Sequence, residues 1–477
     1  MGFEEVRGLD FSLSPSFRPE GGGLGITRPT PANREGRLTE GRSRRCSLFS
    51  MDIKIEKLVY GGEGLGHHDG HTVFVPFVLP DEVVSVLPTD QKKKFVRGRV
   101  EQVVTPSPQR ASPPCRHFTV CGGCHYQHIP YQAQLRYKAE ILRETLGRIG
   151  RVEWGGPIET HASPPFGYRN RAQWKVRPAG PGGKAAIGYF QAGSSTLCAA
   201  EECPILSPRL TETLAALRDL IAQGKLPSTL GEVEVFADSA DQKTLLNASF
   251  ESFDAPPAIL AQTLRDALPS VETILLQETR RERFELIGPG FVHYQVAESR
   301  YRVGHLSFFQ VNRFLMEELV RAVVPNEQGG LALDLFAGVG LFTLPLAQRF
   351  ARVVGVESDL AAARDLQANI DAAKVNAQHV NATVESLLGR WEERPDFVVL
   401  DPPRAGVSGP ALARLVQIAP ARITYLSCDP ATLARDLSTL TGGAGAAGAY
   451  EITALHLFDV FPQTFHIESL VALRRRE

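Results

Sequence analysis

The carboxyl-terminal third of the chain alternates short apolar runs with segments of helical periodicity, beginning at about residue 305. The apolar runs cover residues 331–336, 353–356, 397–400 and 423–426. Short, continuously apolar runs between amphipathic stretches are typical of parallel strands that helices cover on both faces. This pattern predicts a doubly wound, Rossmann-like α/β domain over residues 305–477.

Polar or reactive residues stand at the ends of these predicted strands. They are Asp334, Glu357, Asp401 and Cys428. Ligands of open α/β sheets bind beyond the carboxyl ends of the strands, so we expect these side chains to share one site. A lone cysteine is most often a small buried apolar residue. The Asp-Pro-Pro-Arg sequence that begins at Asp401, and the Glu468 carboxylate farther along the chain, favour a reactive role for Cys428 instead.

A glycine turn follows the first of these strands. Gly338 and Gly340 would let the backbone approach a ligand closely before a helix that we expect to begin near Leu341. An acid about 20 residues beyond such a turn, here Glu357, commonly binds ribose hydroxyls. Thr343 stands where a dinucleotide site would carry a third glycine. The turn therefore favours S-adenosylmethionine over a dinucleotide, the alternative being an ordinary tight turn without a ligand.

Three cysteines, Cys115, Cys121 and Cys124, lie on one short loop that is rich in proline. A fourth thiolate would come from Cys203, which precedes a proline, or from Cys198. Four thiolates suit either a tetrahedral zinc ion or a 4Fe-4S cluster. Cysteine followed by proline recurs at iron–sulfur ligands, and the uneven spacing with a remote fourth residue favours the cluster.

Composition narrows the class of protein further. Seven cysteines among 477 residues do not form a disulfide scaffold, and the clustered ones indicate a reducing compartment. No apolar run approaches the ~20 residues of a membrane helix, and the amino terminus lacks the apolar stretch of a secretory signal. We therefore expect a cytoplasmic protein that does not bind membranes. The net charge of −1 means that any nucleic acid must be bound by local basic patches.

The rest of the chain divides by pattern. Residues 1–50 are rich in Gly, Arg, Ser and Pro and are expected to be disordered, so that Met51 is a candidate start. Residues 51–107 show short strands with glycine turns, which predict a small β-barrel of a kind often used to bind RNA. Residues 108–304 are expected to form a central α+β domain, with a helix over 133–149.

Two basic segments are candidates for binding phosphates, with a solvated surface as the alternative for each. They are Lys92–Lys94, and the set Arg169, Arg171, Lys175 and Arg177.

Taken in order along the chain, these motifs have the arrangement of a known family. Four more short motifs belong to the same arrangement: Phe-Phe-Gln-Val-Asn ending at Asn312, Asp-Leu-Phe-Ala-Gly from Asp334, Ser-Cys-Asp-Pro around Cys428 and Phe-Pro-Gln-Thr from Phe461. From about residue 51 to its end the chain resembles the RNA uracil-5-methyltransferases, and within them the iron–sulfur-containing branch that acts on 23S rRNA.

The resemblance implies a multidomain α/β protein. An N-terminal TRAM-like (OB-like) barrel would be followed by a central α+β iron–sulfur domain and a C-terminal methyltransferase domain, with the helix near residues 125–150 packing on the last of these. It implies a monomeric enzyme that binds RNA, with the following residue roles. S-adenosylmethionine is contacted by Gln310, Phe336, Glu357 and Asp401, and Phe308 stacks on the target base. Cys428 is the nucleophile and Glu468 the general base. The cluster ligands are Cys115, Cys121, Cys124 and Cys203.

The chain departs from the family pattern at three positions. Asp429 replaces a commoner asparagine after the nucleophile, and a carboxylate there is expected to raise the pKa of the Cys428 thiol. Ala337 replaces a frequent cysteine. Thr383 stands where an acid or asparagine often meets the adenine ring.

Three other interpretations of the sequence stay open at this point. One is a tRNA uracil-5-methyltransferase, although that branch typically lacks both barrel and cluster. Another is an RNA-binding iron–sulfur protein without activity. The third is a redox enzyme that uses the cluster for radical chemistry, which a fourth cysteine ligand disfavours.

Overall fold

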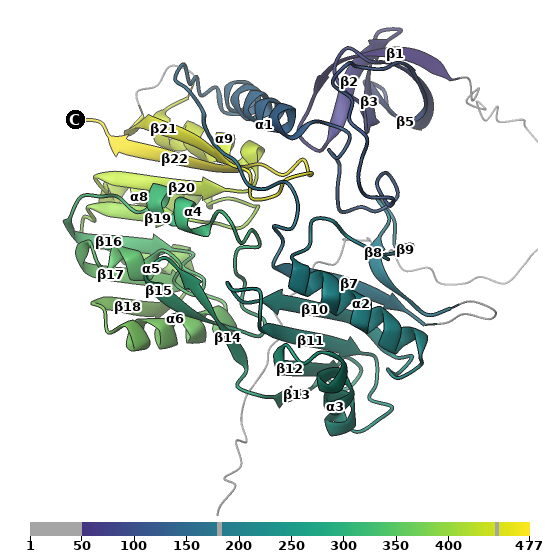
Figure 1. Cartoon of the computed structure of the whole chain (residues 1–477). Helices are drawn as coiled ribbons and strands as arrows, with labels where there is room; N and C mark the ends of the chain where they lie inside the picture. Colours follow the sequence, from purple (N-terminus) through teal and green to yellow (C-terminus); the bar gives the residue numbers. More distant parts are fainter. Residues whose placement is uncertain (1–49, 179–183, 444–447) are drawn as a thin grey trace, which may run out of the picture. The chain divides into compact units, whose positions relative to one another are not determined.

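The computed structural model describes residues 50–178, 184–443 and 448–477 (Figure 1). The extension expected over residues 1–50 lies outside these ranges except for its last residue. None of the described helices is long and apolar enough to cross a membrane.

The first described region is a closed barrel with strand order β1-β2-β3-β5-β4. Its strands are β1 (Met51–Leu58), β2 (Glu63–His68), β3 (His71–Pro76), β4 (Val83–Gln91) and β5 (Phe95–Thr105). Alternate residues point inward, as the period of a strand requires, so that Ile53, Ile55, Val73 and Val75 fill the interior. The barrel predicted from the sequence is confirmed.

The second region is a seven-stranded sheet with strand order β13-β12-β11-β10-β7-β8-β9. Its elements are β7 (Arg171–Arg177), β8 (Ala186–Phe190), β9 (Leu197–Ala199), α2 (Pro208–Ala222), β10 (Leu230–Ala237), β11 (Thr244–Phe250), α3 (Pro257–Ala267), β12 (Val271–Glu278) and β13 (Arg283–Ile287). One core buries the apolar sides of α2 and α3 against the sheet. A two-stranded ribbon, β14 (Phe291–Val296) and β15 (Ser299–Gly304), follows it.

The third region is an eight-stranded sheet with strand order β18-β17-β16-β19-β20-β22-β21-β6. Its strands are β6 (Glu159–His161), β16 (Gly329–Leu335), β17 (Phe350–Glu357), β18 (Ala377–Asn381), β19 (Phe397–Leu400), β20 (Arg422–Ser427), β21 (Tyr450–Phe458) and β22 (Glu468–Arg475). Strands β16 to β20 run parallel, and β22 is antiparallel to β20. The predicted doubly wound sheet is confirmed.

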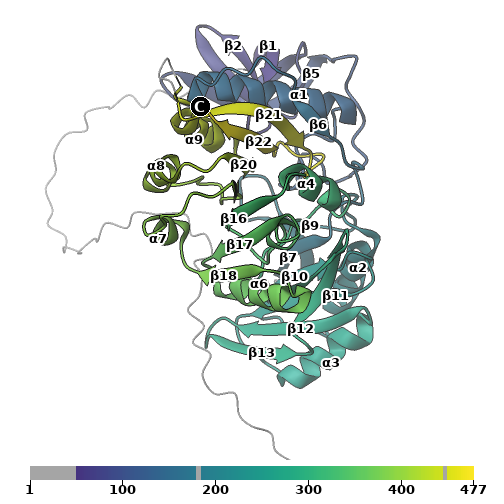
Figure 2. The same ribbon diagram turned by 90° about the vertical axis from the view of Figure 1, so that its left-hand side faces the viewer.

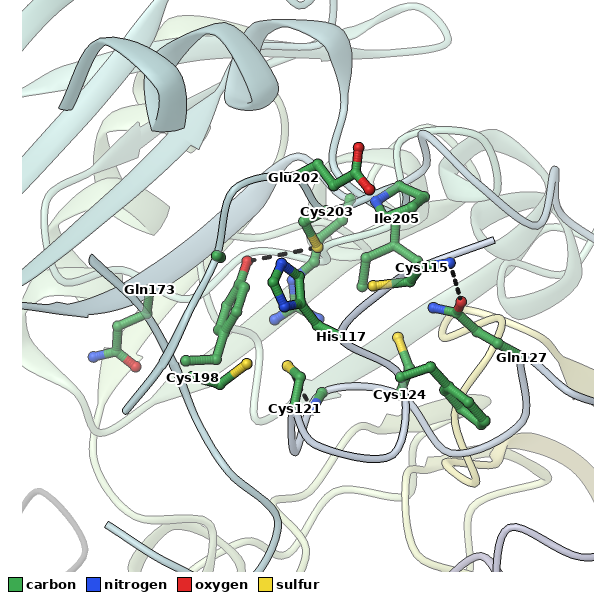
Figure 3. A pocket seen from close by; sticks show the side chains of 16 residues that line it. Cys115, His117, Cys121, Cys124, Gln127, Gln173, Cys198, Glu202, Cys203 and Ile205 are labelled. Carbon is green, nitrogen blue, oxygen red and sulfur yellow. Dashed lines mark hydrogen bonds between the residues drawn. The ribbon is translucent and has the colours of Figure 1, made fainter. Parts of the chain in front are cut away.

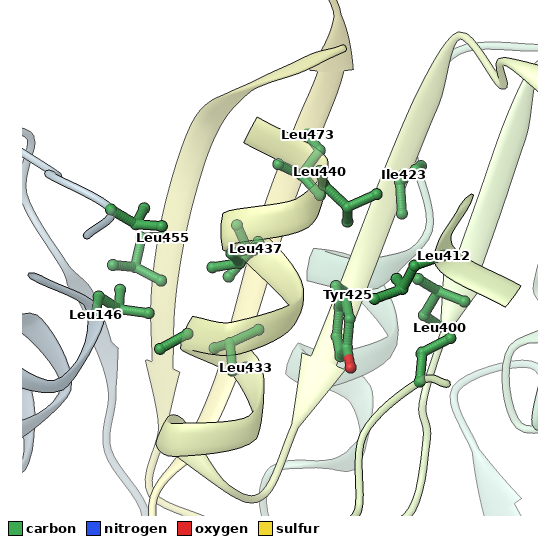
Figure 4. Packing of buried hydrophobic residues seen from close by; sticks show 14 of the residues in the cluster. Leu146, Leu400, Leu412, Ile423, Tyr425, Leu433, Leu437, Leu440, Leu455 and Leu473 are labelled. Atoms are coloured by element: carbon green, nitrogen blue, oxygen red, sulfur yellow. The ribbon is translucent and has the colours of Figure 1, made fainter. Parts of the chain in front are cut away.

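Helices cover both faces of this sheet (Figure 2). They are α4 (Met316–Val323), α5 (Thr343–Leu346), α6 (Leu360–Ala373), α7 (Val384–Leu388), α8 (Gly409–Ile418) and α9 (Pro430–Thr441). One core joins the sheet to α4, α5 and α6, and the other joins it to α7, α8 and α9. In the second core Leu433, Leu437 and Leu440 of α9 pack against the sheet (Figure 4).

A long helix from the segment before the central sheet also belongs to this second core. It is α1 (Tyr131–Thr145), followed by a π-turn, η1 (Leu146–Gly150), where the sequence predicted one helix over 133–149. Leu146 packs beside α9 (Figure 4). Gly150 lies so close to α9 that a Cβ atom there would collide with the carbonyl oxygen of Ala434. This close approach explains why the chain carries glycine at the end of η1.

The helix after the glycine turn differs from the expectation that it begins near Leu341. Gly338 and Gly340 both adopt left-handed backbone conformations, with φ of 55° and 93°. The chain therefore enters helical geometry only at Thr343, and α5 lasts a single turn.

Candidate active site and cysteine cavity

Asp334 lies near the end of β16 and is completely buried. One carboxylate oxygen accepts a hydrogen bond of 2.6 Å from the Thr343 hydroxyl, and the other has no partner among the described residues. Burial raises the pKa of Asp334 to about 7, although the bond from Thr343 opposes the shift. A buried carboxyl with spare hydrogen-bonding capacity is a typical ligand-binding group.

Glu357, at the end of β17, fixes the glycine turn. Its carboxylate accepts hydrogen bonds from the backbone N–H of Gly338 (2.9 Å), Ser358 (2.7 Å) and Asp359 (2.7 Å). Phe336, in the turn, has a φ of 67°, which is rare for a residue with a side chain. The oxygen that accepts from Gly338 retains a free lone pair, so Glu357 can orient the turn and still accept a hydrogen bond from a ligand.

Three further groups from the ends of β19, β20 and β22 are coupled electrostatically. Burial and the nearby Asp334 raise the pKa of Asp401 to about 7. Burial, and next Asp401, raise the pKa of Glu468 well above its ordinary value. Burial, and next Glu468, raise the pKa of the Cys428 thiol to about 11, while Arg404 opposes the shift. The structure thus brings Asp334, Asp401 and Cys428, which all stand at predicted strand ends, together with Glu468.

Asp429 was expected from the sequence to raise the pKa of Cys428, but the structure gives its carboxylate a different role. Its carboxylate accepts hydrogen bonds of 2.9 Å from the backbone N–H of Ala431 and of Thr432. It therefore caps the amino terminus of α9. The charges that raise the pKa of Cys428 are Glu468 and Asp401, because these carboxyls share the pocket with the thiol.

The loop from β21 to β22, which ends at Glu468, is held by α1. Lys138 and Asp459 form an ion pair of 2.6 Å whose side chains are 1% and 0% exposed. Lys138 also donates to the carbonyl oxygen of Phe461. The side chains of Gln134 and Gln463 are joined by a hydrogen bond of 3.0 Å, and the Gln463 N–H donates to Gln134. The position of Glu468 therefore depends on a helix more than 300 residues earlier in the chain.

The barrel also reaches this pocket. The Tyr60 hydroxyl donates a hydrogen bond of 3.4 Å to the carbonyl oxygen of Cys428. Tyr60 also packs edge-on against Phe465 at 5.7 Å between ring centroids. Neither Tyr60 nor Lys138 was identified from the sequence. The signal for Lys138 was present, since it lies three residues after Leu135 and four before Leu142 on the apolar side of α1.

Gln310 and Phe308 lie between β15 and α4, two residues apart along the chain but in opposite environments. Gln310 is 7% exposed and Phe308 is 62% exposed. The intervening Phe309 packs among Phe236, Tyr294 and Tyr301 and fixes this segment. A large exposed aromatic ring offers a surface on which a base can stack.

Other residues singled out in the sequence have partners within the fold. Thr383 caps α7, because its hydroxyl accepts a hydrogen bond of 3.2 Å from the Ser386 N–H. Arg171 and Lys175, expected to bind phosphates, form ion pairs with Glu234 and Glu232 of the neighbouring strand. These two ion pairs stabilise the sheet.

The cysteines of the central region gather around a separate cavity of about 200 Å³. Its lining includes Cys115, Cys121, Cys124, Cys198 and Cys203. Their sulfur atoms face a common space, with Cys198 beside Cys121 (Figure 3). No three of the sulfur atoms in the described chain lie within 4.8 Å of one another. Burial raises the pKa of Cys121 to about 11 and that of Cys124 to about 12, so both are neutral thiols unless a cation binds.

A doubly wound sheet with an acid-lined glycine turn at its carboxyl edge is an arrangement that binds a nucleotide-type cofactor. The chain belongs to the tRNA (uracil-5-)-methyltransferase family, whose sequence model matches residues 130–476. A TRAM domain model matches residues 50–100. The protein is therefore an enzyme that methylates C5 of uracil in RNA with S-adenosylmethionine, which confirms the resemblance found in its sequence.

Individual relatives extend over almost the whole chain. An uncharacterized RNA methyltransferase of Aquifex aeolicus is 33% identical over 90% of this chain and 99% of its own. A 23S rRNA (uracil(1939)-C(5))-methyltransferase of Methylococcus capsulatus is 33% identical over 91% of this chain and 99% of its own. The structure of the Pyrococcus abyssi tRNA (uracil-54, C5)-methyltransferase in complex with S-adenosyl-L-homocysteine is similar with a TM-score of 0.69, at 26% identity, over 89% of this chain and 100% of that one.

Proposed function

We propose that this enzyme methylates a uridine of 23S rRNA through a covalent bond between Cys428 and the uracil ring. The observation that carries the chemical part of the proposal is that Cys428, Glu468 and Asp401 meet at the carboxyl edge of the sheet, where their charges shift one another's pKa values. A thiol and a carboxyl base side by side are the two groups that substitution at C5 of uracil requires.

Cys428 begins the reaction as a thiolate, after its proton has passed to solvent. Its sulfur forms a bond to C6 of uracil, and the electrons of the C5–C6 double bond move toward C5 and the O4 oxygen. S-adenosylmethionine supplies an electrophilic methyl group, which C5 takes while the electrons of the broken bond remain with the sulfonium sulfur. Arg404 favours the thiolate, because its charge lowers the pKa of Cys428.

Glu468 completes the reaction as the base. It removes the hydrogen on C5, the C5–C6 double bond forms again, and the bond from sulfur to C6 breaks to release the thiolate. Burial favours the protonated form of Glu468, whereas Arg404 lowers its pKa and favours the carboxylate. A buried base without surrounding water is suited to a proton that leaves from carbon only after the adduct has formed.

The remaining residues have binding roles in this proposal. Gln310, Phe336, Glu357 and Asp401 hold S-adenosylmethionine. A positively charged donor fits this end of the sheet, because Asp334, Asp401 and Glu468 form an acidic pocket. Phe308 stacks on a uracil that has been turned out of its RNA, and the barrel binds the neighbouring nucleotides.

We propose further that Cys115, Cys121, Cys124 and Cys203 hold a 4Fe-4S cluster. The thiolates of a single tetrahedral zinc ion stand about 3.8 Å apart, since each bond is about 2.3 Å long. The cavity of about 200 Å³ and the wider separation of the sulfur atoms suit a group larger than one ion. Such a cluster would tie the loop of residues 115–124 to the central sheet and suits the reducing cytoplasm, where we propose that the protein works as a monomer.

The choice of 23S rRNA rests on the relatives, since several named for 23S rRNA are 33% identical over most of the chain. The test is to map 5-methyluridine in 23S rRNA and in tRNA from cells with and without the gene. We expect one 23S rRNA position to lose its methyl group and to regain it with the wild-type gene but not with Cys428→Ala. Loss from tRNA alone would assign the enzyme to tRNA, and no loss from either would contradict the proposal.

A further inference from the structure

A second group of metal-binding side chains lies at the edge of the eight-stranded sheet, separate from the cysteine cavity. Strand β6 pairs in parallel with β21, so that Glu159 stands opposite His456 and His161 opposite Phe458. Residues two apart on a strand point to the same face, which brings both histidines and Glu159 to one side of the sheet edge. One ligand atom from each of these three lies within 4.8 Å of the other two.

The spacing of these atoms fits one small ion. The Nε2 atom of His161 is 3.0 Å from Nδ1 of His456, and that Nδ1 is 3.4 Å from a carboxylate oxygen of Glu159. A tetrahedral zinc ion with bonds of about 2.0–2.1 Å holds its ligand atoms about 3.3–3.4 Å apart. Only small movements of the three side chains would therefore be needed to bind such an ion.

A fourth residue fixes the histidine that lies deepest. Nδ1 of His161 is 2.7 Å from a carboxylate oxygen of Glu318, on helix α4. The Nδ1–H therefore donates to Glu318 and leaves the lone pair of Nε2 directed toward His456. A carboxylate that orients a histidine through its second nitrogen is the usual support of a metal-ligating imidazole. The His161 ring also stacks on Phe458, 3.9 Å away and within 2° of parallel.

We propose that His161, His456 and Glu159 bind a divalent transition-metal ion of the zinc class, with water as the fourth ligand. The site is open to solvent on one side, because the Glu159 side chain is 66% exposed while that of His161 is 8% exposed. Two imidazoles and one carboxylate suit zinc and cobalt and do not suit magnesium or calcium, which prefer oxygen ligands. Without an ion, the same contacts form a hydrogen bond between the two histidines.

The position of the site indicates what the ion does. Phe458 ends β21, and the next residue, Asp459, donates its N–H to the carbonyl oxygen of His161 at 3.0 Å. The same Asp459 forms the buried ion pair with Lys138 at the start of the loop that leads to Glu468. A bound ion would join β6, β21 and, through His161, helix α4. It would therefore fix the start of the loop that carries the proposed base.

The test is to titrate the purified full-length protein with Co²⁺ and to follow the absorbance. The protein keeps whatever group its cysteine cavity holds on purification. Nitrogen and oxygen ligands give visible cobalt bands without the near-ultraviolet band of thiolate ligation. We expect the wild-type protein to bind one equivalent of Co²⁺ with visible bands and no near-ultraviolet thiolate band. His456→Ala should not bind that equivalent. Glu318→Gln should bind it about 10–100-fold more weakly, because the histidine is no longer oriented by a carboxylate.

Two further variants keep the result clear. Glu159→Gln changes an exposed side chain and should weaken cobalt binding even if His456→Ala fails to fold. His67→Ala is the matched control. It removes a barrel histidine that contacts Glu56 at 2.7 Å but belongs to no group of three metal-binding side chains among the described residues, so this variant should bind cobalt like wild type. Equal cobalt uptake and equal spectra for wild type, His456→Ala and Glu159→Gln would overturn the proposal, as would uptake by thiolate ligands alone.

Discussion

The central sheet and the catalytic sheet both enclose acidic side chains, but in different electrostatic settings. In the central sheet, Glu234 is paired with Arg171 and also accepts a hydrogen bond of 3.0 Å from Asn247. In the catalytic sheet, Asp334, Asp401 and Glu468 form no ion pair among the described residues, and burial raises the pKa of each. Paired acids stabilise a fold, whereas unpaired buried acids reduce stability and so indicate a binding or catalytic site.

The largest effect is expected on the catalytic side of this comparison. Glu468→Gln keeps the shape of the side chain and removes the base, so with RNA in excess over enzyme the turnover to free methylated RNA should fall by about 10²–10⁴-fold. The measurement is transfer of labelled methyl groups to undermodified RNA. Glu451→Gln, at an exposed ion pair with Arg474 on the same sheet, is the control and should retain its rate. A loss below tenfold for Glu468→Gln would mean that another group is the base.

The next effect concerns the buried ion pair of Lys138 and Asp459, which supports the site. Lys138→Met leaves Asp459 charged and unpaired in the interior, and we expect a loss of about 3–5 kcal/mol in the free energy of unfolding. Urea denaturation measures it. The matched control is Lys54→Met, which breaks an exposed pair with Asp81 and should cost less than about 1 kcal/mol. Equal losses for the two variants would show that burial of the pair has no special effect.

A smaller loss is expected in the central sheet. Glu234→Gln takes the charged partner away from Arg171, whose side chain is only 12% exposed. Loss of a hydrogen bond to a charged group should lower the free energy of unfolding by about 1.5–3 kcal/mol. Thermal or urea denaturation measures the change, with Glu285→Gln at the exposed pair with Arg283 as the control. If Glu234→Gln were as stable as wild type, the acids of the two sheets would not differ as described.

The smallest effect is a change in how stability depends on pH. An unfolded aspartate releases its proton near pH 4, whereas burial raises the pKa of Asp334 to about 7 in the folded protein. Between these values the folded state holds more protons, so this group makes the free energy of unfolding decrease as pH rises. Asp334→Asn should reduce that slope by up to about 1.4 kcal/mol per pH unit.

Urea denaturation between pH 5 and 8 checks this slope. Thr343→Val is the companion variant, because it keeps the carboxyl and removes the hydrogen bond that lowers its pKa. It should extend the decrease in stability to higher pH. Identical slopes for wild type and Asp334→Asn would show that this carboxyl is not shifted by burial.

Local sequence predicted the parts of the site that lie at strand ends. Asp334, Glu357, Asp401 and Cys428 each follow or end an apolar run, and in a parallel sheet such positions meet at one edge. The barrel could be predicted in the same way, because its strands alternate in burial with a period of two.

Contacts between distant segments could not be predicted in this way. Lys138 meets Asp459, 321 positions away, and Tyr60 meets Cys428, 368 positions away. The helical spacing around Lys138 places it on the apolar side of α1, but nothing in the sequence around either residue names its distant partner. Strand β6 has only three residues, which is too short for alternation to be recognised. The roles of Asp429 and Thr383 were missed for a related reason, since helix capping depends on where α9 and α7 begin.

The central claim is that Cys428 bonds to the uracil and that Glu468 resolves the adduct, and one measurement tests it directly. Glu468→Gln is incubated with undermodified 23S rRNA fragments and S-adenosylmethionine, then run on a denaturing gel beside the double variant Cys428→Ala, Glu468→Gln. We predict a methylated RNA–protein adduct that survives denaturation in the single variant and is absent from the double variant. Normal methylated RNA without an adduct in the single variant, or an adduct that persists without Cys428, would contradict the account.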